Sequence, residues 1–325
     1  MVKNSMKKIL VTGSVGQIGS ELTMALREKY GNDNVVACGR KTKPSEKLLN
    51  SGPFEFMDIT DREVVEKVVK KHDIDTIYNM AAILSAIGEQ NPLICWNVNI
   101  NGLYNILEIA REHKITRVFI PGSIAVFGPE TPRKNTPQET ILKPKTMYGI
   151  TKVTGELLGD YYFKKFGLDV RGIRYPGIIS SETLPGGGTT DYAVEIFYEA
   201  IKNKKYTCFL KKDTVLPMMY MPDCIKATID LMEADILNLK HHCDFNLASM
   251  SFSAGELSDE IKKYIPEFKC EYKPDFRQEI ADSWPQSIDD TPARKEWNWK
   301  ASYDLPSMTK DMIEILSKRF KNGKL

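Results

Sequence analysis

Short apolar runs alternate with longer amphipathic stretches over the first 175 residues of the chain. Runs rich in β-branched and other apolar residues, typical of buried strands, lie at residues 8–12, 34–38, 54–57, 74–78, 116–120 and 169–175. Between these runs apolar residues recur at helical spacing, which predicts helices over residues 17–30, 61–71, 92–113 and 147–166. Such alternation is typical of a parallel sheet with helices on both faces. The pattern therefore predicts a doubly wound α/β domain.

The regular alternation ends after the sixth apolar run. One proline and three glycines at residues 185–188 interrupt the chain, and the segments that follow are short and mixed. Among them, residues 253–256 match a capping box, which predicts the start of a helix. We therefore expect one domain over residues 1–177 and a smaller α/β lobe over residues 178–325. Part of about residues 203–245 is expected to return to the first domain.

The charge balance argues against two classes of partner. The 325 residues carry 45 Lys and Arg against 43 Asp and Glu, a net charge of +2, and the two signs are interspersed. Nucleic-acid-binding domains usually carry a basic excess, so we expect no nucleic-acid partner. The sequence also lacks an apolar run of about 18 residues, the length that a membrane-spanning helix needs, so we expect no membrane partner.

The cysteines indicate a reducing environment. None of the six forms a C-x-x-C pair, and their neighbours are apolar or strand-like. We interpret them as free thiols in a reducing intracellular compartment, either the cytoplasm or the mitochondrial matrix. His241, His242 and Cys243 have the composition of a metal site, but consecutive residues rarely share one tetrahedral ion. We therefore expect no metal.

A glycine loop connects the first predicted strand to the first predicted helix. Gly13, Gly16 and Gly19 are spaced G-x-x-G-x-x-G, and Gln17 and Ile18 lie between the last two. Glycine permits a tight turn and lets backbone N–H groups approach a pyrophosphate, while the start of the helix adds positive partial charge. A glycine pattern alone is weak, but its place between a strand and a helix predicts a dinucleotide site. We therefore expect residues 1–177 to be a dinucleotide-binding domain and residues 178–325 to be a substrate-binding lobe.

A tyrosine and a lysine at helical spacing provide candidate acid–base chemistry. Tyr148 and Lys152 lie four residues apart at the start of a predicted helix, so both side chains lie on one face. An ammonium beside a phenol favours the phenolate, so we expect Lys152 to lower the pKa of Tyr148 and make it a general base. Ser123 lies at the end of the fifth predicted strand, where parallel sheets bind ligands. Its hydroxyl can hydrogen-bond a substrate oxygen, with a helix or turn cap as the alternative role.

The glycine-rich segment at residues 185–188 suggests an anion site. It precedes Thr189, Thr190 and a predicted helix. Successive N–H groups of such a loop can cradle an anion, such as the carboxylate of an amino acid. A flexible loop without a ligand is the alternative, so this segment supports an amino-acid substrate only weakly.

These motifs together resemble the extended branch of the short-chain dehydrogenase/reductase superfamily, whose members carry a Rossmann fold. Blocks similar to the short-chain-type L-threonine 3-dehydrogenases lie at residues 11–22, 81–86, 174–180, 185–193 and 282–294. The resemblance implies oxidation of the β-hydroxyl of L-threonine to 2-amino-3-ketobutyrate with NAD as the cofactor. It also implies that Ser123, Tyr148 and Lys152 are the catalytic residues.

The resemblance assigns further side chains to the cofactor and the substrate. Besides the glycine loop, Tyr148 and Lys152, it implies cofactor contacts from Asp58, Ile59, Met80, Ala81, Ala82, Asn99, Tyr175 and Ile178. Substrate contacts are implied for Ser85, Ser123, Tyr148, Gly186, Thr189 and Trp284. Core packing is the alternative role for Trp284. Extended members usually dimerise through two long helices, so we expect a homodimer formed by the helices at residues 92–113 and 147–166.

Arg40 departs from the usual NAD-binding pattern. The second predicted strand is followed by Gly39 and Arg40, where an acidic residue usually binds the ribose 2′-hydroxyl of NAD. Arg40 could bind a 2′-phosphate, which would favour NADP, or it could stack over the adenine, which is compatible with NAD. Because the other blocks of the family are intact, we expect NAD and count Arg40 among the cofactor-binding residues.

Two other functions fit parts of the pattern. A sugar-nucleotide epimerase or dehydratase of the extended branch would share the fold. Between Arg174 and Arg277, however, the sequence contains no arginine to clamp a diphosphate, which disfavours that function. A non-catalytic dinucleotide-binding sensor would have no use for Ser123, Tyr148 and Lys152 together.

Overall fold

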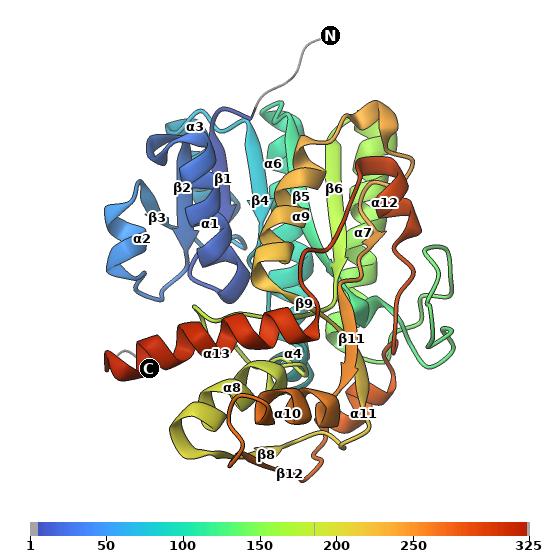
Figure 1. The fold of residues 1–325 in the computed structure, drawn as a ribbon. Helices are drawn as coiled ribbons and strands as arrows, with labels where there is room; N and C mark the ends of the chain where they lie inside the picture. The colour runs from blue at the N-terminus through green and yellow to red at the C-terminus, as the bar shows by residue number, and fades with distance from the viewer. Residues whose placement is uncertain (1–5, 185, 324–325) are drawn as a thin grey trace.

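A seven-stranded parallel sheet lies at the centre of the structure, a computed structural model that describes residues 6–184 and 186–323 (Figure 1). Its strand order is β10-β6-β5-β4-β1-β2-β3, with parallel pairing throughout. The strands are β1 (Ile9–Thr12), β2 (Val35–Gly39), β3 (Phe54–Phe56), β4 (Thr76–Asn79), β5 (Arg117–Ser123), β6 (Asp169–Tyr175) and β10 (Phe245–Asn246). The chain order reverses between β1 and β4, and sheets of this kind bind ligands at such a point.

Helices cover both faces of this sheet (Figure 1). One face carries α1 (Gln17–Tyr30), α9 (Met221–Glu233) and α12 (Thr291–Trp297), and the other carries α3 (Arg62–Lys71), α6 (Leu103–Glu112) and α7 (Met147–Phe166). Alternate strand residues point to opposite faces. Ile9 and Val11 therefore pack on the α1 side, whereas Leu10 packs on the α3 side. The expected doubly wound α/β fold is confirmed.

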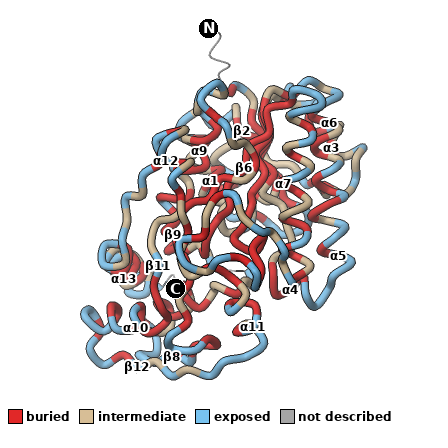
Figure 2. Tube along the Cα trace, turned by 90° about the vertical axis from the view of Figure 1, so that its right-hand side faces the viewer, coloured by how far each residue is buried: buried red, intermediate tan, exposed pale blue. Residues whose placement is uncertain are grey.

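A smaller part of the molecule lies beyond the carboxyl edge of the large sheet (Figure 1). It holds a three-stranded sheet of order β11-β9-β7 and a parallel pair β12-β8. These strands are β7 (Gly177–Ile179), β8 (Lys205–Cys208), β9 (Val215–Tyr220), β11 (Met250–Ser253) and β12 (Lys269–Tyr272). The helices α8 (Tyr192–Asn203), α10 (Ala254–Lys262) and α13 (Leu305–Lys321) pack around a separate apolar core, which Figure 2 shows as buried chain. The shorter helices of the structure are α2 (Glu46–Asn50), α4 (Ser85–Gln90), α5 (Pro92–Trp96) and α11 (Arg277–Asp282).

Local sequence signals explain where several helices begin. The Asp61 carboxylate accepts a hydrogen bond from the first turn of α3, and Ser253 and Glu256 form the predicted capping box of α10. Thr146 caps α7 in the same way, since its hydroxyl accepts from the N–H of Gly149. The cap fixes the start of α7 and so places Tyr148 in its first turn.

The expected continuous helix over residues 92–113 is wrong at its centre. The chain forms α5, then a π-helical turn over Asn97–Gly102, and then α6. The Asn99 side chain explains why this turn is held in place. Its amide accepts from the N–H of Ile83 and donates to the Ile83 carbonyl, which ties the turn to the segment that follows β4. Single π-turns inside helices are often found at functional sites.

The chain crosses from one sheet to the other more than once. It leaves the large sheet at Tyr175 and enters the small one with β7 at Gly177. It returns to the large sheet later, because α9 covers one face and β10 pairs with β6. The functional division of the chain at residue 177 stays a prediction. Within residues 6–184 and 186–323, no helix combines the length and the apolar character needed to cross a membrane.

Candidate active site

An open cleft of about 1020 Å³ lies at the carboxyl edge of the large sheet, where the smaller part of the molecule faces it. Most of the predicted contact residues line this cleft, namely Gly13, Gly16, Gln17, Ile18, Gly19, Met80, Ala82, Ser85, Ser123, Tyr148, Lys152, Tyr175, Ile178, Thr189 and Trp284. They come from segments far apart in the sequence, so the fold collects them in one place. This is the position at which an open α/β sheet binds its ligands.

The glycine loop is built from close backbone contacts. Gly13 has φ +61°, and a Cβ there would lie 2.7 Å from the backbone nitrogen of Ala81. A Cβ on Gly19 would lie 2.2 Å from the Gly13 carbonyl oxygen. Side chains at these two positions would therefore displace the loop from the backbone segments it packs against. The loop leads into the start of α1, whose free N–H groups suit a pyrophosphate.

An unpartnered amide at the loop fits a bound cofactor. The Nε2 of Gln17 is buried and finds no hydrogen-bond partner among the described residues, although Gln17 lines the cleft. Buried polar atoms normally have a partner, so a ligand with an acceptor group would complete this site. The loop and Gln17 together are compatible with a dinucleotide.

Ser123, Tyr148 and Lys152 meet at the inner end of the cleft. Tyr148 is 9% exposed, and the Nζ of Lys152 lies 5.3 Å from the centre of its ring. The ammonium of Lys152 donates to the Pro121 carbonyl at 2.6 Å. Ser123 ends β5, and its Oγ accepts from the N–H of Ala125 at 3.2 Å. A phenol, a hydroxyl and an ammonium around one space can move a proton at a substrate oxygen.

The expectation that Lys152 lowers the pKa of Tyr148 is wrong for the chain by itself. Burial raises the pKa of Tyr148 to about 12, and the interaction with the Ser123 hydroxyl lowers it only in part. Burial also lowers the pKa of Lys152 to about 8. Desolvation outweighs the hydrogen bond with Ser123, so Tyr148 is a neutral phenol at pH 7 in the chain alone. A further positive charge in the cleft would favour its deprotonation.

The expected carboxylate cradle at the glycine-rich loop is already used by the chain. The N–H groups of Gly187 and Gly188 both donate to Oδ2 of Asp191, at 2.9 and 2.7 Å. Gly186 is exposed and does not belong to the cleft lining, which Gly188, Thr190 and Asp191 join instead. Burial raises the pKa of the Asp191 carboxyl to about 6. An acidic residue three positions after the last glycine was the signal for this closed loop.

Two further contacts shape the substrate end of the cleft. The hydroxyl groups of Ser85 and Thr189 lie 3.3 Å apart and join the start of α4 to the loop before α8. Trp284 is 4% exposed, and its carbonyl accepts from Nε of Arg133. Each contact joins two segments that are distant in the sequence. The walls of the cleft therefore depend on tertiary packing.

The remaining predicted cofactor residues lie outside the cleft lining. Arg40 and Asp58 follow β2 and β3, and their charged groups approach to 3.8 Å. The amide group of Asn99 is occupied by Ile83 and also donates to Thr151, so Asn99 orients the segment after β4. The other two residues of this set, Ile59 and Ala81, support the same region. Ile59 packs against Gly102, and the N–H of Ala81 donates to Thr12.

Comparison with known proteins identifies the family. A sequence model of the NAD dependent epimerase/dehydratase family matches residues 9–248. This chain belongs to that family. An uncharacterised epimerase/dehydratase of Staphylococcus haemolyticus is 48% identical over 318 residues, which span 98% of this chain and 100% of the relative.

Among solved structures, this chain is similar to one group of enzymes within the NAD dependent epimerase/dehydratase family. An L-threonine dehydrogenase from Clostridium difficile is 54% identical, with a TM-score of 0.94 over 97% of this chain and 99% of that one. A monomeric L-threonine 3-dehydrogenase from a metagenome database, in its apo form, is 52% identical, with a TM-score of 0.92 over 95% and 99%. The resemblance seen in the sequence is confirmed, and the family implies a nicotinamide dinucleotide cofactor.

His241, His242 and Cys243 do not converge on a common point. The Nδ1 of His241 pairs with Glu296 at 2.6 Å, and the ring of His242 stacks on Phe163 with centroids 3.8 Å apart. Cys243 is buried with its thiol in the core of the α7 side. Across the described residues, no group of three or more His, Cys, Asp and Glu side chains is placed to hold a metal.

We predict that Gly19→Ala weakens the binding of NAD by roughly tenfold or more, because the new methyl group overlaps the Gly13 carbonyl and displaces the loop. Gly155→Ala is the matched control, since Gly155 lies outside the loop and its Cβ would come closest to the end of the Leu103 side chain, at 3.3 Å. Isothermal titration calorimetry with NAD measures both affinities. Equal affinities for the two variants would contradict this account of the loop.

Proposed function

We propose that this chain is an L-threonine 3-dehydrogenase that oxidises the β-hydroxyl of L-threonine to 2-amino-3-ketobutyrate with NAD. The proposal is supported chiefly by the cleft, in which Ser123, Tyr148 and Lys152 lie together. The chain that forms this cleft is similar to a threonine dehydrogenase over 97% of its length. Residues 1–177, with the later segments that return to the large sheet, hold the dinucleotide. The smaller lobe then provides the far wall of the substrate site.

The chain's own residues provide the proton chemistry. Tyr148, once deprotonated, accepts the proton of the substrate β-hydroxyl, while Ser123 hydrogen-bonds the same oxygen as the carbonyl forms. Lys152 keeps a positive charge beside the phenol and is held by the Pro121 carbonyl. NAD, when bound, supplies the acceptor for the hydride that leaves the β-carbon, together with a positive charge near Tyr148.

The charges of the cleft favour an amino acid over a sugar nucleotide. Lys152 and Asp191 are the charged side chains among the described residues that line it. One positive and one negative group suit a zwitterionic substrate. A sugar nucleotide would bring a second diphosphate, which arginine usually binds, and no arginine lines this cleft in the described part of the chain. The epimerase alternative is therefore disfavoured.

We predict that Tyr148→Phe lowers kcat for threonine oxidation by about 100- to 10,000-fold, because the general base is lost. Tyr264→Phe is the control, since Tyr264 is 42% exposed and does not line the cleft. Initial rates of NADH formation with L-threonine measure turnover, and calorimetry checks that NAD still binds. Retained turnover in Tyr148→Phe would contradict the catalytic role, and no turnover in the native chain would contradict the proposed function.

We also propose that NAD is preferred over NADP. Arg40 is the candidate phosphate ligand, but its guanidinium already faces the Asp58 carboxylate at 3.8 Å. A 2′-phosphate at this place would meet the negative charge of Asp58, which costs binding free energy.

The corresponding prediction concerns Asp58→Asn, which removes that repulsion and should raise the kcat/KM ratio of NADP to NAD by about tenfold. Asp33→Asn, a change at an exposed carboxylate before β2, is the control. Initial rates with each cofactor give the ratio. A native enzyme that uses NADP as well as NAD would contradict the argument.

A homodimer is the proposed assembly. Large apolar side chains are exposed on α5 and α7, which pack against each other; they are Leu93, Ile94, Trp96, Leu157 and Tyr161. Exposed apolar patches of this kind often mark interaction surfaces. One similar solved protein is monomeric, so a mass measurement distinguishes the two assemblies. Light scattering at micromolar concentration should give twice the mass of the chain, and a monomer mass would contradict the proposal.

The cysteines support a reducing compartment as the proposed location. All six are free thiols, and five of them are buried. Chains that work in oxidising compartments commonly pair such residues.

A further inference from the structure

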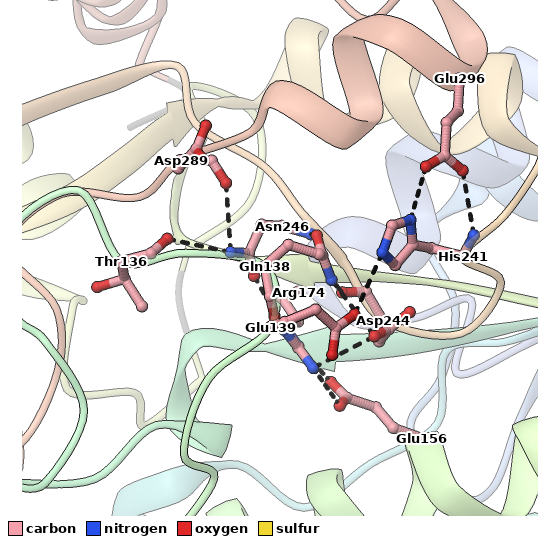
Figure 3. Close-up of polar contacts among 10 residues, drawn as sticks. All are labelled: Thr136, Gln138, Glu139, Glu156, Arg174, His241, Asp244, Asn246, Asp289 and Glu296. Carbon is pink, nitrogen blue, oxygen red and sulfur yellow. Dashed lines mark hydrogen bonds and ion pairs between the residues drawn. The ribbon is translucent and has the colours of Figure 1, made fainter.

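A buried ion pair lies behind the catalytic lysine and has no part in the proposed reaction so far. Glu156 on α7 and Arg174 on β6 form two parallel hydrogen bonds, from Nε to Oε1 and from Nη2 to Oε2, both 2.9 Å long. Glu156 is 6% exposed and Arg174 is 2% exposed. Figure 3 shows the guanidinium of Arg174 reaching both Glu156 and Asp244. Pairs with this geometry are strong and well oriented.

The helix places this pair in line with the site. Tyr148, Lys152 and Glu156 are spaced four residues apart on α7, so their side chains lie on one face, and all three are buried. A second, much smaller cavity lies next to the cleft, and Lys152 and Glu156 both line it. Lys152 also lines the main cleft, so it lies between the two spaces. Glu156 therefore faces Lys152 from the small cavity and not from the main cleft.

Few other charges act on Lys152. From α5, the Cys95 thiol approaches it, but burial raises the pKa of Cys95 and keeps the thiol neutral. Cys243, which lines the same small cavity, is also a neutral thiol, because burial raises its pKa well above the usual value. From α7 itself come the neutral phenol of Tyr148 and the carboxylate of Glu156. Glu156 is thus the ionised acid facing Lys152 among the described residues.

Two positive charges next to Glu156 favour its carboxylate form. Arg174 pairs with it directly and Lys152 attracts it from one helical turn away, whereas Asp244, 3.5 Å from Arg174, repels it. Burial raises the pKa of Glu156, and the charge and two hydrogen bonds of Arg174 are the main effects that oppose this rise.

Arg174 is itself held rigidly. It donates to the Gln138 carbonyl at 3.0 Å and to Oδ1 of Asn246 at 3.1 Å. Gln138 in turn accepts from the N–H of Asn246 and donates to the Asp244 carbonyl (Figure 3). This network fixes the guanidinium, so the carboxylate of Glu156 cannot move away from its place.

We propose that Glu156, locked by Arg174, is a positioning residue that keeps Lys152 protonated and therefore keeps a positive charge beside the Tyr148 phenol. The inference rests on the proposed function, because that charge matters only if Tyr148 acts as the base. Burial lowers the pKa of Lys152 to about 8, close to neutral pH, so the loss of the facing carboxylate would lower this pKa further and increase the neutral fraction of the lysine at pH 7. A purely structural pair would support the fold without affecting the titration of Lys152.

Three variants separate these roles: Glu156→Gln, Arg174→Gln and the double variant. Glu156→Gln leaves the positive charge of Arg174 unbalanced, and the midpoint of the Lys152 titration should fall by about one pH unit. Arg174→Gln leaves the carboxylate without its partner and should not lower the midpoint. The double variant removes both charges and should return the midpoint towards the native value. Glu260→Gln, at a buried carboxyl on α10 far from the site, is the control.

The titration is followed by NMR of ¹³C-labelled lysine in the cofactor-free protein, with Lys152→Met to assign the signal. The pH profile of kcat/KM for threonine is the second readout. Its alkaline limb should move to lower pH in Glu156→Gln and recover in the double variant. A lower plateau with unmoved limbs, and an unchanged Lys152 midpoint, would overturn the proposal and leave a structural pair.

The experiment also distinguishes a variant that fails to fold from a failure of the proposed function. If Glu156→Gln does not fold, the Lys152 midpoints of Arg174→Gln and of the double variant decide, because they differ only in the charge of Glu156. Equal midpoints in those two variants would overturn the proposal. If the native chain does not oxidise threonine, the proposed function fails, whereas the NMR titration still tests the coupling of Glu156 to Lys152, since it needs neither cofactor nor substrate.

Discussion

The site depends on keeping one lysine ammonium charged inside the protein. Lys152 is buried, and burial lowers its pKa to about 8 even with the Glu156 carboxylate nearby. Its charge is stabilised by the Pro121 carbonyl at the end of β5 and by the carboxylate of Glu156 on the same helix. Because Tyr148 lies one turn earlier on that helix, fixing Lys152 also fixes the phenol beside Ser123. The geometry of the proposed active site therefore follows from how α7 is held against β5 and β6.

The parts of the structure that have local causes were predictable from the sequence. The helices at residues 17–30 and 147–166 have the expected bounds, since a glycine loop or a capping threonine marks each start. The alternation of strands and helices was enough for the fold class. Ser123, Tyr148 and Lys152 could be found because a strand end and a four-residue spacing on a helix are visible in the sequence, and the structure brings all three to one cleft.

Features that depend on contacts between distant residues were not predictable. The strand β10 has only two residues and exists because β6 offers it an edge. The π-turn around Asn99 depends on Ile83. The wrong expectation for Gly186 has a local cause instead, because Asp191, three residues after the last glycine, accepts from the loop N–H groups and was not weighed. The pKa of Tyr148 also lay beyond the sequence, since the spacing to Lys152 does not report the depth of burial.

Transfer of deuterium from L-[3-²H]threonine tests the central claim most directly, because it follows the bond that breaks. The native chain is incubated with the labelled amino acid and NAD, and the nicotinamide product is examined by NMR. The account predicts one deuterium at C4 of the reduced nicotinamide ring for each ketone formed. Reduced cofactor without deuterium, or no reduced cofactor at all from a chain that binds NAD, would contradict the account.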